Sequence, residues 1–156
     1  MADPQKVLKL LRDELDVHTR HMKLLEAQQG ALLACDRPRF CGMKAEQELM
    51  LQLLEAQKTA REHALTDAGG NLMAISALIE RCPEKQRKGL WLVQDRLIQT
   101  VKRVKDLSSQ NKRLIENEIE YIAFTLDLFV EAGRKQKNVY GGFGSLRSRM
   151  LLDRRA

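Results

Sequence analysis

The stretch "LWLVQDRLIQTVKRVKDLSSQNKRLI", residues 90–115, decides the fold. Within it apolar residues recur at alternating steps of three and four, the spacing of one helix face. The same spacing continues to Phe129, so the pattern predicts one long helix over residues 84–132. Its seam consists of Leu90, Leu97, Val101, Val104, Ser108, Asn111, Ile115, Glu118, Ile122, Thr125 and Phe129.

Two more long helices are predicted before it. Asp3 precedes Pro4 and Asp36 precedes Pro38 by two positions, so each pair supplies a capping carboxylate with a proline in the first helical turn. Heptad-like apolar seams follow both starts and predict helices over 4–34 and 38–66. Gly69 and Gly70 mark the end of the second helix.

A short helix is predicted over 71–81, where several apolar residues precede Pro83. No segment shows the sustained alternation of period two that marks a strand. The predicted fold is all-α: an elongated antiparallel bundle of three long helices and one short helix, with a flexible C-terminal tail. No run of about 18 apolar residues and no signal peptide is present, so neither membrane insertion nor secretion is expected.

The charge distribution divides the chain. The formal net charge is +6, yet residues 1–133 hold 20 basic and 20 acidic side chains. Residues 134–156 hold seven basic side chains against Asp153 alone. We therefore expect a neutral helical bundle over 1–133 and a basic, disordered, substrate-binding tail over 134–156. The three cysteines are odd in number and are read as reduced thiols of a cytoplasmic protein.

Candidate catalytic and metal sites are weak. His18 and His21 form an H-x-x-H pair on a helix, but the only other histidine, His63, lies on another predicted helix without a supporting carboxylate pattern. The glycines of "GGFG", residues 141–144, follow a helix and not a strand, unlike a phosphate loop. We expect no metal, no cofactor and no enzymatic activity.

Polar residues interrupt the seam of the third long helix at Ser108, Asn111, Glu118 and Thr125. A buried polar seam residue lowers stability but can fix the register of helix packing. Alternatively, this part of the seam is open and receives a helix of a partner protein. The residues alone leave both interpretations standing, with register favoured.

These features together resemble the FlgN-type flagellar export chaperones. The resemblance rests on Leu107 to Asn111, on Leu114 to Ile119, and on the Y-G-x-x-G of Tyr140 to Gly144, which follows the helices. The turn from Asp36 through Phe40 to Lys44 is similar to the family as well. Ser108 replaces an asparagine that the family often has, which leaves the role of position 108 open.

The resemblance implies a cytoplasmic chaperone of type III export. Such proteins bind the C-terminal helical segments of hook-associated proteins, keep them from assembling prematurely and deliver them to the export gate. Tyr140 matches the tyrosine implicated in docking to the gate's cytoplasmic domain. Leu146, Met150 and Leu151 would share one apolar face of a short helix. We assign cargo binding to Leu146, Met150, Leu151, Phe143 and Asn111.

Two other functions remain as alternatives. A helical protein could use the basic tail on the phosphates of a nucleic acid, although aromatic residues are sparse there. A structural coiled-coil oligomer is the other, because heptads of this quality can self-associate and a homodimer is compatible with them.

Overall fold

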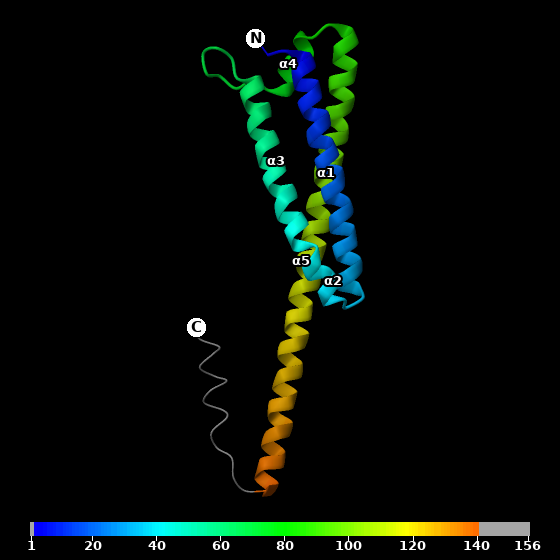
Figure 1. The fold of residues 1–156 in the computed structure, drawn as a ribbon, viewed down its shortest axis with the longest axis vertical. Helices are drawn as coiled ribbons and strands as arrows, with labels where there is room; N and C mark the ends of the chain where they lie inside the picture. The colour runs from blue at the N-terminus through cyan, green and yellow to red at the C-terminus, as the bar shows by residue number, and fades with distance from the viewer. Residues whose placement is uncertain (1, 141–156) are drawn as a thin grey trace. The chain divides into compact units, whose positions relative to one another are not determined.

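The structure of the chain is a computed structural model that describes the backbone of residues 2–140 and the side chains of residues 2–136. It divides into two compact units, Met1–Leu114 and Ile115–Ala156. The helices are α1 (Pro4–Leu33), α2 (Arg37–Gly42), α3 (Lys44–Leu65), α4 (Ile75–Arg81) and α5 (Glu84–Tyr140), which are labelled in Figure 1. The all-α class is thereby confirmed; within residues 2–140 the sole β interaction is an isolated bridge between Thr66 and Leu72.

The start of α1 follows the predicted capping chemistry. Asp3 is the N-cap, and its Oδ1 accepts a hydrogen bond from the Gln5 amide at 3.0 Å. The helix ends at Leu33, and Cys35, two residues later, is left-handed with a φ of 53°. The Asp36 amide then donates to the Ala31 carbonyl at 2.8 Å, as in a helix-terminating Schellman turn.

The predicted single helix over 38–66 is wrong, because a turn at Met43 divides it into α2 and α3. Asp36 caps α2 by accepting from the Arg39 amide at 3.2 Å. The Met43 amide donates to the Phe40 carbonyl, three residues back, and this tight turn interrupts the α-helical hydrogen bonds just after Gly42. The expected set of three long helices and one short helix is corrected accordingly.

The segment between α3 and α4 is longer than predicted. The short helix was expected from residue 71, yet α4 begins at Ile75. The preceding residues form a turn in which an Asp67 carboxylate oxygen accepts from the Gly69 and Asn71 amides, each at 2.9 Å. Leu72 then pairs with Thr66 in the β-bridge, so this residue is unavailable to a helix.

The core of the first unit lies where α1, α4, the end of α3 and the beginning of α5 meet. Its buried members are Val7, Leu11, Leu65, Leu78, Ile79, Cys82, Leu90, Val93 and Leu97. A second, smaller cluster joins α1 to α5 through Leu25, Val104 and Leu107. In Figure 1, the first half of α5 crosses behind α1, α3 runs beside them, and α4 lies at the end of the unit where α1 begins.

Helix α5 is much longer than its neighbours. It has 57 residues, against 30 in α1 and 22 in α3. It was expected to end at Ala132, but it continues to Tyr140. It passes through Gly133, where a Cβ atom would meet no neighbouring side chain within 4 Å. In the part of the chain that is described, no helix is long and apolar enough to cross a membrane.

Candidate functional site

Among the residues whose side chains are described, the second half of α5 carries a large share of the exposed apolar surface. Ile119 is 60% exposed, Leu126 56% and Phe129 71%. Together with Ile115 and Ile122 they recur at steps of four, three, four and three, which places all five on one helix face. We call this set the distal stripe. Tyr121, Phe124 and Leu128 add further exposed apolar area outside it.

The distal stripe has the composition of a binding surface. A helix with this much exposed apolar area normally buries it against another helix or a partner. Within residues 115–136 of the second unit, α5 is the only helix described. The stripe therefore has no covering helix among the described residues of its own unit.

Asn111, predicted to bind cargo, lies inside the first unit. It is 4% exposed, and its Nδ2 donates to the Leu25 carbonyl of α1 at 3.0 Å. This bond links α5 to α1 at a fixed point, which is what a register-setting polar residue does. Of the other polar seam residues, Ser108 is exposed, and Thr125 Oγ1 donates to the Tyr121 carbonyl one turn earlier at 2.8 Å. The cargo-binding role of Asn111 stays a prediction.

The remaining predicted site residues are not placed. Phe143, Leu146, Met150 and Leu151 lie outside the described residues. Tyr140 is the last residue of α5, and its backbone is described while its side chain is not. Cargo binding by the first four residues and gate docking by Tyr140 therefore stay predictions.

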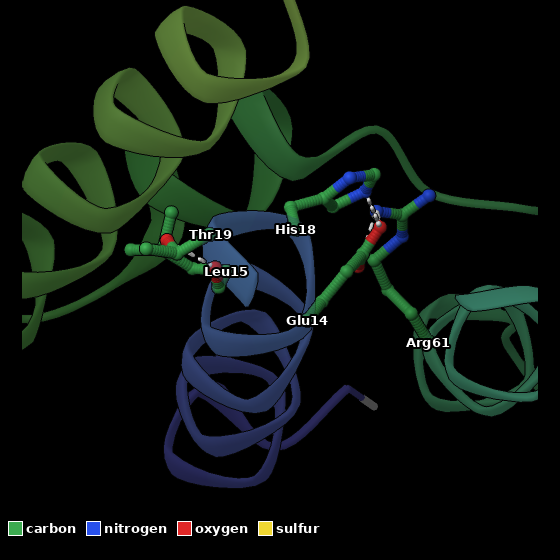
Figure 2. Close-up of polar contacts among 5 residues, drawn as sticks. All are labelled: Glu14, Leu15, His18, Thr19 and Arg61. Carbon is green, nitrogen blue, oxygen red and sulfur yellow. Dashed lines mark hydrogen bonds and ion pairs between the residues drawn. The ribbon is translucent and has the colours of Figure 1, made fainter. Parts of the chain in front are cut away.

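A buried polar cluster joins α1 to α3 at Glu14, which is 6% exposed. Arg61 of α3 reaches across and donates from one nitrogen to both carboxylate oxygens, at 2.6 and 2.7 Å (Figure 2). His18 lies one turn further along α1, with Nε2 3.9 Å from a Glu14 oxygen. At this position an ion pair, and not apolar packing, links α1 to α3.

Burial shifts the pKa values in this cluster. Removal from water raises the pKa of Glu14, and the positive charge of Arg61 offsets that shift only in part. Burial, with the nearby His21 and Arg61, lowers the pKa of His18. Burial alone lowers the pKa of His21, and neither of its ring nitrogens has a hydrogen-bond partner among the described residues.

The histidine pair, with His21 buried and His18 half-buried, accordingly belongs to the packing of α1. Across residues 2–136, no group of three or more His, Cys, Asp or Glu side chains is arranged to hold a metal ion. His63, the third histidine, is exposed on α3. The cluster around Glu14 supports the fold and positions no nucleophile.

The predicted seam shares Ile115, Ile122 and Phe129 with the distal stripe, and an open seam that receives a partner helix was the less favoured of its two interpretations. A signal of exposure was present in the lengths of the predicted helices, since the helix over 84–132 is far longer than either partner. Ile119, Leu126 and Phe124 were not singled out, and they are the residues that the structure adds to the candidate site.

Comparison with known proteins supplies the identity. No curated protein and no solved structure matches the chain. A family model described as "FlgN protein" matches residues 1–148, which takes in both the helices and the segment from Tyr140 to Gly144. The chain therefore belongs to the FlgN family, the flagellar export chaperones, whose members act in the biogenesis of the bacterial flagellum.

Proposed function

We propose that this protein is a cytoplasmic chaperone that binds the C-terminal helical segments of flagellar hook-associated proteins and delivers them to the type III export gate. The observation that carries the proposal is the family match over residues 1–148. Members of this family bind hook-associated proteins. Binding would keep these cargo proteins from assembling before export.

Cargo binding is assigned to the residues that follow α5. Phe143, Leu146, Met150 and Leu151 provide four large apolar side chains within nine residues. An amphipathic cargo helix is recognised by a few buried apolar anchors, which contribute most of the binding energy. The exposed apolar residues of α5 support this assignment, because they extend apolar surface along the helix that leads to these four.

The gate-docking role is assigned to Tyr140. This tyrosine ends α5 and directly precedes the glycines of residues 141–142. A rigid helix before it and the cargo-binding residues after it would let one short segment serve two partners. Delivery would then consist of the gate binding Tyr140 while cargo is held beyond it.

The experiment separates the two roles. Leu146→Ala with Met150→Ala removes the apolar anchors and should weaken capture of the cargo's C-terminal helix by at least about tenfold. Tyr140→Ala should leave cargo capture unchanged and weaken capture of the gate's cytoplasmic domain. Leu33→Ala with Leu49→Ala is the matched control, since both leucines are exposed on the first unit. Loss of cargo capture by the control, or none by the tail variant, would contradict the proposal.

A further inference from the structure

Helix α5 carries its charge in two opposite blocks. Residues 84–114 hold nine basic and three acidic side chains, and we call them the basic block. Residues 115–133 hold five acidic side chains and no basic one, and we call them the acidic block. Summed over the whole bundle these charges cancel, which hides the separation. A helix with such blocks complements a second copy of itself that runs in the opposite direction.

The first unit also contains an open groove beside the basic block. Its volume is about 780 Å³, and it lies between α3, α5 and the segment before α4, with Glu14 and His18 of α1 also lining it. Its apolar lining includes Leu65, Leu72, Ile75, Leu97, Ile98 and Val101. Leu72 is 60% and Ile98 47% exposed, so the groove presents apolar area to solvent.

The charged groups of the groove leave a positive excess. Arg61 and Glu14 bind each other, as described above. Of the remaining charged side chains, Lys58 and Lys105 are basic and Glu62 is acidic. The contact of Lys58 with Glu55 is long, at 3.9 Å, and solvent-exposed, so it holds Lys58 weakly. The groove thus combines an apolar lining with two lysines able to meet acidic side chains.

The acidic block has the matching properties. Its distal stripe supplies exposed Ile119, Leu126 and Phe129, and its carboxylates include Glu120 and Asp127, seven residues apart. Both blocks belong to one continuous helix, α5. A parallel pair of α5 helices would set like charges together, whereas an antiparallel pair sets opposite charges together.

We propose that two copies of this chain associate through α5 in antiparallel fashion, the acidic block of each copy lying in the groove along the basic block of the other. The arrangement has two-fold symmetry, so the contact forms twice in each dimer. The distal stripe is then buried against the apolar lining of the partner's groove. This dimer does not rest on the proposed function, because neither its surfaces nor its test involves a cargo protein.

Charge reversal tests the pairing through a rule that follows from it. The groove variant is Lys58→Glu with Lys105→Glu, and the block variant is Glu120→Lys with Asp127→Lys. Each alone sets like charges at both contacts, so self-association should weaken at least about tenfold. Mixing the two variants restores opposite charges at both contacts, so the mixture should form a dimer. The control is Lys9→Glu with Lys23→Glu, the same charge change on exposed positions of α1.

The measurement is sedimentation equilibrium of the full chain, with helix content checked by circular dichroism. The wild type should approach twice its mass of 17.9 kDa at high micromolar concentration. Trp91 reports the same event, since it is 60% exposed and lies one heptad before Ile98. Its emission should shift to shorter wavelength as the dimer forms. A wild type that stays monomeric, a dimer unaffected by either variant, or folded variants that fail to pair when mixed would overturn the proposal.

Discussion

Replacing Arg61 by methionine tests whether the Glu14 cluster holds α3 against α1. The substitution keeps an unbranched side chain and removes the only cation that hydrogen-bonds the buried Glu14 carboxylate among the described residues. Breaking a buried ion pair from one side costs about 3–5 kcal/mol. The Arg61 side chain is 21% exposed, so water can enter in its place, and we expect a loss of about 2–3 kcal/mol.

The assay is thermal unfolding followed by circular dichroism. A loss of that size should lower the unfolding midpoint by about 5–10 °C for a domain of this length. Adding Glu14→Leu to the Arg61→Met variant removes the unpaired carboxylate and should recover most of the loss. Arg12→Met is the control, because Arg12 is exposed on α1 and should change the midpoint little. An Arg61→Met midpoint equal to that of the control, or a double variant as unstable as the single one, would refute the reasoning.

Three further predictions concern stability. Asn111→Leu should leave the free energy of unfolding unchanged or raise it by about 1 kcal/mol, because the Asn111 amide oxygen is buried without a hydrogen-bond partner among the described residues. Chemical unfolding measures this, and a large loss of stability would contradict it. Cys35→Gly should stabilise by about 1 kcal/mol, since φ at this position is 53°. The lowered pKa values of His18 and His21 mean that the folded state binds fewer protons than the unfolded state below their ordinary value of 6.5. The contribution of these two histidines to the free energy of unfolding should therefore be present above pH 6.5 and be lost as the pH falls below it. His21→Leu should flatten this pH dependence in unfolding curves.

The starts of the helices could be predicted because they depend on residues that are close together in the sequence. Asp3 and Asp36 accept hydrogen bonds from the first turns of α1 and α2, as their spacing to proline indicates. The turn at Met43 could not be predicted in this way, since no proline or run of glycines marks it. The predicted end of α5 at Ala132 is too early, because a solvent-exposed glycine such as Gly133 lowers helix stability only modestly and the helix continues to Tyr140.

The candidate site was harder to predict, because exposure depends on which helices lie alongside. The heptad spacing of Ile119 and Phe129 is the same whether a partner helix covers them or not. Asn111 illustrates the converse case: its place in the seam was visible, but its bond to the Leu25 carbonyl joins residues 86 positions apart. Charge summed over residues 1–133 likewise concealed the two blocks of α5, since the positive charge of one nearly cancels the negative charge of the other.

The central claim is that the residues after α5 hold the cargo. The most direct test compares the full chain with a chain that ends at Tyr140, which keeps the whole of α5. Both are titrated against a fluorescently labelled C-terminal helical segment of a hook-associated protein, and anisotropy reports binding. We expect saturable binding by the full chain, loss of that binding by the shortened chain, and nearly equal thermal unfolding of the two. Equal affinity of both chains for the segment would contradict it and would assign the cargo to the described helices.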